Sequence, residues 1–267
     1  MFEPTHMSYS SLSQYERCPR SYYLNKVRSA QEKQTWFFPV GTAVHESIEA
    51  YVSTGDVPDF ESILFPLLQS QLALEPDDVN WLSGGSATEP IIRDRAVQLG
   101  KDCVENAVLF LEDIEVHHVE YDATGMLPGC PVPVKAYVDI LGEHKKHGPV
   151  IVDWKTSRQK PKDALQLETY AALLKLRKLD FEYKTGLWGM LRPGVPKARP
   201  IDLSNVDAAA LGKRYGDTYQ RIVKGIWPTE AGYNCKFCTQ SPNCLLEAGP
   251  TKRATYYDRA HEDGTPF

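Results

Sequence analysis

The sequence lacks a long apolar run and a leader-like beginning. No stretch approaches the roughly 20 apolar residues that a helix needs to cross a bilayer, so we expect no membrane span. The first residues show no basic start followed by an apolar stretch, which a secretory signal requires. We therefore expect a cytoplasmic protein, in which thiols stay reduced.

Positive charge is scarce as well. The chain has 30 Lys and Arg residues against 35 Asp and Glu residues, which gives a net charge of −5. Proteins that coat duplex DNA neutralise many phosphates with basic side chains, so this balance argues against that class. It leaves room for a basic groove that is local.

Internal repeats and low-complexity linkers are also absent. The length allows one elaborated domain or two small ones, and we expect one domain over residues 1–267. Residues 8–113 are mostly helical in pattern, and residues 114–226 mix strands with helices. A cysteine-containing loop follows at 227–246, and then a polar tail at 247–267.

The expected elements change in kind along the chain. Helices are predicted at 8–28 (broken near Pro19), 43–52, 60–74, 89–113, 163–179 and 205–226. Strands are predicted at 114–121, 133–141, 149–155 and 182–191. The polar loop GEHKKHG suits a hairpin between the second and third strands. This order predicts a mixed α/β core with an N-terminal helical insertion.

Charged residues directly follow the apolar part of one predicted strand. The apolar run 150–152 precedes Asp153-Trp154-Lys155. Residues two apart in a strand point to the same face, so Asp153 and Lys155 should project together. Asp139, expected near the end of the preceding strand, could bring its carboxylate beside Asp153. Two close carboxylates repel unless a cation joins them, and oxygen ligands suit Mg²⁺ or Mn²⁺. The alternative is a surface ion pair, and the apolar run favours the metal site.

Two weaker patterns accompany this acidic centre. Gln166 and Tyr170 are four apart on a predicted helix, so they share a face and could hold DNA or order the surroundings of a metal. His45, in Gly41-x3-His45 at the predicted start of a helix, could be a metal ligand. The plainer alternatives are a partly buried tyrosine beside a glutamine and a surface or capping histidine.

Four cysteines bracket these motifs. They are Cys18, Cys235, Cys238 and Cys244. Clustered cysteines in a reducing compartment favour metal binding over disulfides. Four thiolates could hold zinc or an iron–sulfur cluster, and either would join the two ends of the chain. Cys103 and Cys130 lie in a helical pattern and a turn, and we expect ordinary packing roles for them.

In this order, the motifs resemble those of the RecB-like branch of the PD-(D/E)XK nucleases, over residues 8–246. The matching motifs are Gly41-x3-His45, Asp139, Asp153-x-Lys155 and Gln166-x3-Tyr170. The four cysteines resemble the iron–sulfur clasp of some members. Those members include AddB-type helicase–nucleases, stand-alone exonucleases of CRISPR adaptation and phage-encoded relatives. Many superfamily members have Glu at position 153, but Asp is common in this branch.

The resemblance implies a restriction-endonuclease-like fold: a mixed sheet flanked by helices, with a [4Fe–4S] cluster clasping the two ends. The implied ligands of Mg²⁺ or Mn²⁺ are His45, Asp139, Asp153 and the backbone carbonyl of Trp154. Asp139, Asp153 and Lys155 would be catalytic. Gln166 and Tyr170 would assist by positioning the substrate.

The activity implied by the resemblance is exonucleolytic hydrolysis of DNA, typically single-stranded and 5′→3′. Recombination, replication or CRISPR-adaptation proteins would be partners, in a bacterial, archaeal or phage-infected host cytoplasm. Two alternatives stay open: a module that binds and processes DNA ends within a larger complex, and a structure-specific endonuclease.

Basic and aromatic side chains near these motifs could contact DNA. The basic ones are Arg17, Arg20, Lys26 and Arg28 near the first cysteine, and Arg158, Lys160 and Lys162 after the acidic strand. The aromatic ones, which could stack on unpaired bases, are Tyr22, Tyr23, Trp36 and Phe37. The plain alternative for each is a solvated charge or a core aromatic.

Overall fold

A computed structural model describes most of the chain. The described residues are 2–30, 32, 37–72, 89–177, 179–232, 235, 238–241 and 243–244. Trp36 and the tail at 247–267 lie outside them. Within these ranges, no helix has the length and apolar character that a membrane span requires.

The N-terminal helices are interrupted at Cys18. A short strand, β1 (Met7–Ser8), leads into α1 (Tyr9–Arg17), α2 (Pro19–Tyr22) and the π-helical turn η1 (Tyr23–Val27). The Ser8 hydroxyl caps α1 by accepting the Ser11 N–H at 3.2 Å. Cys18 is extended because the ring of Pro19 disfavours a helical residue before it. The predicted break is therefore confirmed.

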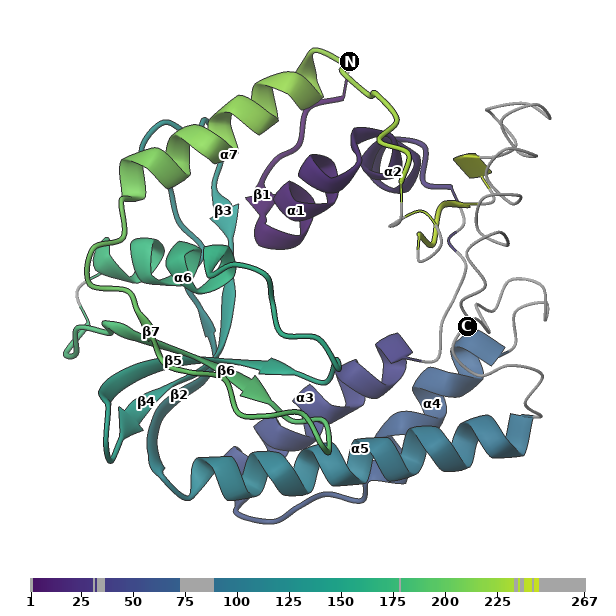
Figure 1. Ribbon diagram of the computed structural model, residues 1–267, viewed down its shortest axis with the longest axis vertical. Coiled ribbons are helices and arrows are strands. Elements are labelled where there is room, and N and C mark those ends of the chain that lie inside the picture. The colour runs from purple at the N-terminus through teal and green to yellow at the C-terminus, as the bar shows by residue number, and fades with distance from the viewer. Residues whose placement is uncertain are drawn as a thin grey trace.

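Three longer helices pack on one face of the sheet (Figure 1). They are α3 (Phe37–Thr54), α4 (Phe60–Leu72) and α5 (Glu89–Leu111). Helix α3 begins well before the predicted position 43, because Pro39 in its first turn needs no N–H partner and Gly41 does not end it. His45 consequently lies in the middle of α3, so its predicted place at a helix start is wrong.

The sheet has five strands in the order β2–β4–β5–β6–β7. Their bounds are β2 (Ile114–Asp122), β4 (Tyr137–His144), β5 (Gly148–Lys155), β6 (Thr185–Met190) and β7 (Ile201–Asp202). Strands β2, β4 and β5 are antiparallel neighbours, whereas β6 runs parallel to β5. Helix α6 (Leu165–Lys175) lies in the connection between the two parallel strands. The predicted fold class, a mixed sheet flanked by helices, is confirmed.

The predicted single strand at 133–141 is wrong. Ala136 separates β3 (Val134–Lys135), which pairs with β1, from β4. Strand β4 then continues through 142–144, which pair with 148–150, so the hairpin turn is shorter than predicted. Asp139 therefore lies near the start of β4 and not near its end. Because β4 and β5 are antiparallel, this position still lies at the sheet edge where β5 ends.

Strand β5 is covered on both faces. Ile151 packs in the core shared with α1, α6 and α7 (Ala208–Val223). Its neighbours Val150 and Val152 pack in the core of α3, α4 and α5. Side chains alternate between the faces of a strand, so an unbroken apolar run is what a doubly covered strand requires. Both α6 and α7 are shorter than the predicted helices at 163–179 and 205–226.

The segment after α7 returns to the N-terminal helices (Figure 1). The Tyr15 hydroxyl donates to the carbonyl of Ile226 at 2.6 Å. The Trp227 ring stacks on Tyr22, with centroids 6.1 Å apart and planes at 11°. Tyr22 is 3% exposed, so the prediction that it could stack on unpaired bases is wrong. The two ends of the chain are thus joined by packing between protein side chains.

Candidate active site

Two carboxylates lie at one edge of the sheet, on neighbouring strands. Asp139 on β4 is 7% exposed and Asp153 on β5 is 2% exposed. Oδ2 of Asp139 accepts the backbone N–H of Trp154 at 2.6 Å. Burial raises the pKa of the Asp153 carboxyl, the Asp139 charge raises it further, and Lys155 opposes both effects. A cation at this edge would relieve the cost of holding both carboxylates ionised.

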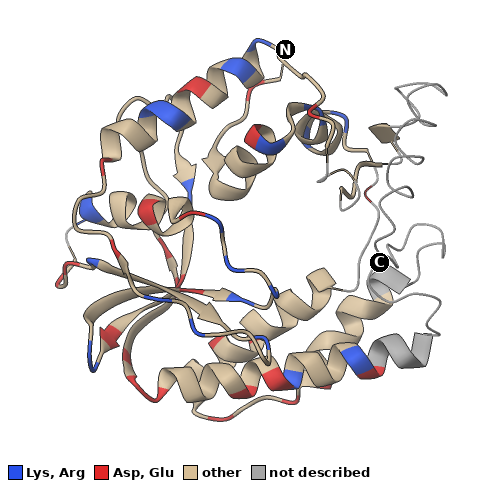
Figure 2. Ribbon diagram, in the orientation of Figure 1, with Lys and Arg blue, Asp and Glu red and all other residues tan. Residues whose placement is uncertain are grey.

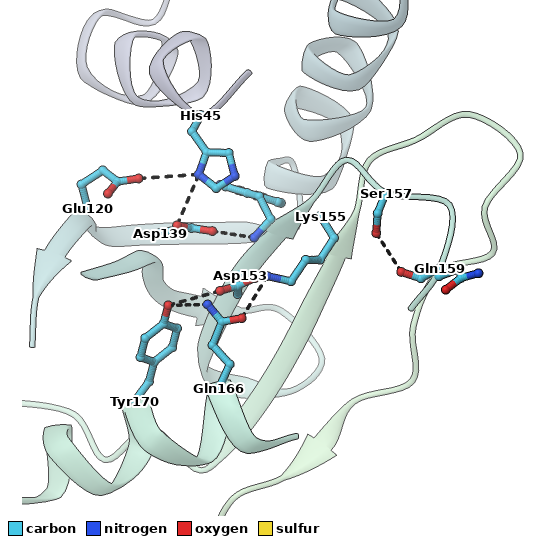
Figure 3. A network of polar contacts seen from close by, with 10 residues as sticks. His45, Glu120, Asp139, Asp153, Lys155, Ser157, Gln159, Gln166 and Tyr170 are labelled. Carbon is cyan, nitrogen blue, oxygen red and sulfur yellow. Dashed lines mark hydrogen bonds and ion pairs between the residues drawn. The ribbon is translucent and has the colours of Figure 1, made fainter. Parts of the chain in front are cut away.

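Asp153, Lys155, Gln166 and Tyr170 form a closed ring of polar contacts (Figure 3). The Lys155 ammonium pairs with Oδ2 of Asp153 and donates to Oε1 of Gln166 at 3.0 Å. The Gln166 amide donates to the Tyr170 hydroxyl at 2.8 Å, and that hydroxyl donates to Oδ1 of Asp153 at 3.3 Å. The four-residue spacing on α6 aims both polar groups at the end of β5. Gln166 and Tyr170 therefore position the lysine and the aspartate.

Trp188 is a further neighbour of Lys155. It lies on β6 opposite Asp153, and the Lys155 Nζ is 5.0 Å from the centre of its ring. A cation over an indole face is attracted by the electron density of the ring. Trp154 points to the other side of β5, where its ring packs edge-on against Phe110 at 5.3 Å.

His45 and Glu120 approach Asp139 from α3 and β2. The His45 Nδ1 lies 3.4 Å from Oδ1 of Asp139 and 3.9 Å from Oε1 of Glu120. Within the described ranges, these three residues are the group of metal-ligating side chains whose ligand atoms all lie within 4.8 Å of one another. Asp153 is outside that group, because its carboxylate contacts Lys155 and Tyr170.

The His45 ring carries the positive charge in this arrangement. Burial alone would lower its pKa, but the nearby carboxylates of Asp139 and Glu120 outweigh burial and raise the pKa to about 10. The protonated His45 ring therefore lies beside the carboxylates. To bind a metal ion, it would have to lose this proton, because a histidine ligand is neutral. A nitrogen and at least two carboxylates fit a divalent cation such as Mg²⁺ or Mn²⁺.

Glu120 is absent from the predicted site. It lies between Val119, which pairs with Ile140, and Tyr121, which pairs with Val138, so it faces Asp139 across the ladder. Its backbone has a φ of 48°, in the left-handed region that costs a side-chain-bearing residue about 1–2 kcal/mol. The sequence gives one signal for Glu120: it is an acidic residue near the end of the predicted strand 114–121. That strand is expected to lie beside the strand that carries Asp139.

The predicted DNA contacts are spread over several elements. Arg17 is exposed on α1, and the Arg20 guanidinium lies 4.9 Å from the centre of the Tyr23 ring. Arg158 and Lys160 are exposed in the loop after β5, where the Lys160 ammonium donates to the carbonyl of Lys197 at 3.4 Å. This loop is next to the acidic centre, whereas α1 and α2 lie on the side opposite this loop (Figure 1).

The four cysteines come near one another without closing into a compact site. The Cys238 thiol lies 3.7 Å from the hydroxyl of Ser21 on α2. Burial raises the pKa of the Cys244 thiol, and so do the nearby Cys18, Cys238 and Cys235. No three of these described sulfur atoms lie within 4.8 Å of one another.

A protein-family profile decides the assignment. The family described as the PD-(D/E)XK nuclease superfamily matches residues 6–245. The chain belongs to the PD-(D/E)XK nuclease superfamily. Membership supports a metal-dependent hydrolytic nuclease with DNA as its substrate, and His45, Glu120 and Asp139 are a possible metal site of this nuclease.

Other comparisons add little to this assignment. No curated protein matches the chain. A solved structure described as "Crystal structure of SSO0001" is 16% identical, with a TM-score of 0.39, and the match covers 77% of this nuclease and 95% of that chain.

Proposed function

We propose that this nuclease is a divalent-metal-dependent DNA exonuclease that acts on single-stranded DNA in the 5′→3′ direction. The observation that carries the hydrolytic part is the buried pair Asp139 and Asp153, held with Lys155 at one sheet edge. The single-strand preference, exonucleolytic action and direction rest on the resemblance of the motifs to the RecB-like branch.

The residues at this edge have separable roles. His45, Glu120 and Asp139 would hold the ion, and Asp153 is a further predicted ligand with the Trp154 carbonyl. Oδ2 of Asp153 is buried, and its partner among the described residues is the Lys155 ammonium, so a metal ion bound here would share this carboxylate with the lysine. A bound divalent ion supplies Lewis acidity, because it lowers the pKa of water and polarises a phosphate oxygen.

Lys155 supplies a positive charge that the substrate can contact. Its side chain is 24% exposed, so the ammonium can contact an incoming phosphate while Asp153, Gln166 and Trp188 hold it in place. From there it can orient the attacking water or offset negative charge that develops on the phosphate oxygens. Burial raises the pKa of Tyr170, so its hydroxyl keeps its proton and remains a hydrogen-bond donor.

We also propose that Cys18, Cys235, Cys238 and Cys244 bind a [4Fe–4S] cluster. Support comes from Cys18, Cys235 and Cys238, which all lie near enough to Cys244 to raise the pKa of its thiol, and from the resemblance to cysteine-bearing relatives. The sulfur atoms around one tetrahedral zinc ion would lie about 3.8 Å apart. No three of these four described sulfur atoms lie even within 4.8 Å of one another. A cluster with iron at its corners holds thiolates more widely. Iron and sulfide analysis of anaerobically purified protein, with absorbance near about 400 nm, tests this assignment.

A labelled-substrate assay tests the activity. Purified protein is mixed with Mg²⁺, Mn²⁺ or Ca²⁺ and with linear single strands labelled at the 5′ or the 3′ end, duplexes, or closed single-stranded circles. The proposal predicts immediate release of the 5′ label, progressive shortening of 3′-labelled strands and intact circles. Cut circles would indicate an endonuclease. Binding without cleavage in any ion would indicate a DNA-end binding module.

Matched variants test the site assignment. Asp153→Asn and Lys155→Gln should lower the cleavage rate by on the order of 100- to 1000-fold while the protein stays folded. Glu143→Gln, an exposed carboxyl on β4, is the control and should cleave at the wild-type rate. Full activity in a folded Asp153→Asn protein would refute this active site.

A further inference from the structure

Two basic loops leave the sheet beside Lys155. Because β5 and β6 are parallel neighbours, the chain leaves both strands at the same edge. The N–H of Leu191 donates to the carbonyl of Lys155 at 2.9 Å, so the loop after β6 starts next to the lysine. Figure 2 shows basic segments on both loops. Their basic side chains are Arg158, Lys160, Lys162, Arg192, Lys197 and Arg199, against a single acidic one, Asp163.

Arg192 is held on a rigid piece of backbone. The Asn106 amide on α5 donates to the carbonyl of Leu191 at 2.8 Å. The next four residues form a tight turn, in which the Val195 N–H donates to the Arg192 carbonyl at 3.2 Å. Proline at the second position and Gly194 at the third, with a φ of 75°, are typical of a type II turn. The position of Arg192 beside the active site is therefore preorganised.

Arg158 and Arg192 form a pair of like charges. Partial burial lowers the pKa of the Arg192 guanidinium, and the charge of Arg158 lowers it further. Neither guanidinium has an ion pair or side-chain hydrogen bond with any described residue. The nearby Cys103 thiol supplies no counter-charge, because burial raises its pKa to about 12. An anion between the two arginines would remove an electrostatic cost that the folded protein otherwise carries.

Arg214 shows how a carboxylate satisfies a guanidinium group in this nuclease. The Arg214 guanidinium makes two hydrogen bonds of 2.7 Å to the Glu16 carboxylate, which is the forked geometry that satisfies this group. A phosphate offers the same paired oxygens. The unmatched pair next to Lys155 therefore has the chemistry of a site for a phosphate that arrives with the substrate.

We propose that Arg158 and Arg192 bind a phosphate of the nucleic-acid substrate adjacent to the one that Lys155 faces. This subsite rests on the proposed function, which brings a DNA strand to this edge of the sheet. The phosphate is either an internal phosphodiester or the terminal phosphate of a strand. Both sources present the same oxygens to the guanidinium groups.

Binding measurements test the pair. Arg158→Gln, Arg192→Gln and the double variant are made in an Asp153→Asn background without added divalent ions, so that the substrate stays intact during the binding measurement. The control is a double variant with the same charge change, Lys146→Gln with Lys224→Gln, at exposed positions away from this edge. The arginine double variant should bind a single-stranded oligonucleotide about tenfold more weakly. Its salt dependence, d log K/d log [salt], should be smaller by about 0.7 for each phosphate that the variant no longer binds. The control should change neither.

Modified substrates locate the phosphate. Oligonucleotides carry one uncharged methylphosphonate linkage at successive positions, or have 5′ or 3′ ends with and without phosphate. Removal of the bound charge should weaken binding about tenfold when both arginines are present and have no effect on the double variant. We call this dependence of the loss on the two arginines the coupling. Coupling at an internal linkage identifies a phosphodiester, and coupling at an end identifies a terminal phosphate. Equal losses at every position in both proteins, or no single-strand binding, would overturn the subsite.

These measurements also separate the subsite from the nuclease activity. If Mg²⁺ and Mn²⁺ support no DNA cleavage but the coupling is present, the proposed function fails and the subsite stands. If DNA is cleaved and no coupling is found, the subsite fails and the activity stands.

Discussion

The Lys155 ammonium donates a hydrogen bond of 3.0 Å to the amide oxygen of Gln166. The same ammonium pairs with Asp153 and lies over the ring of Trp188. A lysine side chain has four flexible carbons, so its charge is positioned only if several partners restrain it. Gln166 is the partner that links the lysine to Tyr170 and hence back to Asp153.

Gln166→Leu should slow cleavage by about tenfold, because the lysine loses its hydrogen-bond acceptor and Tyr170 loses a donor. The loss should appear in kcat, since Gln166 positions the reacting Lys155 and contacts no substrate itself. Gln220→Leu, at an exposed position on α7, is the control for the same substitution. A changed KM with an unchanged kcat would contradict this role for Gln166.

Glu120→Gln should weaken Mn²⁺ binding by about tenfold, because it removes one of the three side chains grouped around the predicted ion. Isothermal titration of the purified protein with Mn²⁺ measures this without any substrate. Glu115→Gln, an exposed carboxyl on the same strand, should bind Mn²⁺ like the wild type. Equal affinities in the two variants would remove Glu120 from the metal site.

Local periodicity explains which parts of the site could be predicted. The apolar run before Asp153 predicts a buried strand, and the two-residue repeat places Lys155 on the same face. The four-residue spacing of Gln166 and Tyr170 likewise fixes a common helix face. The prediction that Asp139 meets this group required only that β4 and β5 form a hairpin.

Glu120, Trp188 and Arg192 could not be found in this way. Glu120 faces Asp139 only because of the register between β2 and β4 and its left-handed backbone. The parallel register of β6 against β5 brings Trp188 to Lys155 and places Arg192 directly after Leu191, whose N–H donates to the Lys155 carbonyl. Register between distant segments depends on packing of the whole sheet, and no local pattern encodes it. For the same reason, the two-residue pairing of β1 with β3 was not predicted.

Cys103 should make the stability of this nuclease depend on pH in the alkaline range. Its thiol is fully buried, and burial raises its pKa to about 12, whereas a thiol in the unfolded chain ionises near about 8.5. The native state therefore keeps a proton that the unfolded state loses. The contribution of the protonated Cys103 thiol to the free energy of unfolding is fully present below about pH 8.5. It is lost at about 1.4 kcal/mol per pH unit as the pH rises above that value.

Urea unfolding of the wild type and of Cys103→Ala between pH 7 and pH 10.5 measures this contribution. The variant should be less stable at pH 7 by about 1–2 kcal/mol, because a buried group is removed. The difference should shrink as the pH rises, since other titrating groups are common to both proteins. A difference that stays constant with pH would contradict an inaccessible, protonated thiol.

Gly212→Ala should destabilise the protein, although alanine is the better helix former. A Cβ at Gly212 on α7 would lie 1.9 Å from the carbonyl oxygen of Pro128, so helix and loop would have to move apart. We expect a loss of about 1–3 kcal/mol in the free energy of unfolding. Gly232→Ala is the control, because a Cβ there meets nothing within 4 Å. Equal thermal stabilities of the two variants would show that α7 does not depend on this close approach.

Cys18→Ser and Trp227→Ala should separate the proposed cluster from the closure of the fold. Cys18→Ser removes a thiolate and should abolish iron binding, but the contacts of Trp227 with Tyr22 and of Tyr15 with Ile226 remain. The protein should therefore still fold, with a lower melting temperature. Trp227→Ala removes a ring packed between the N-terminal helices and should cost about 2–3 kcal/mol even in iron-free protein.

Iron content, circular dichroism and thermal unfolding of both variants, with and without a chelator, distinguish these effects. A chelator should lower the melting temperature of the wild type to that of Cys18→Ser and should leave Cys18→Ser unchanged. Cys130→Ser is the control for the loss of a buried thiol outside the proposed cluster. If Cys18→Ser retained full iron content, the clasp would need a different ligand. If Cys18→Ser failed to fold at all, the aromatic contacts would be too weak to hold the ends together, and closure would depend on the metal.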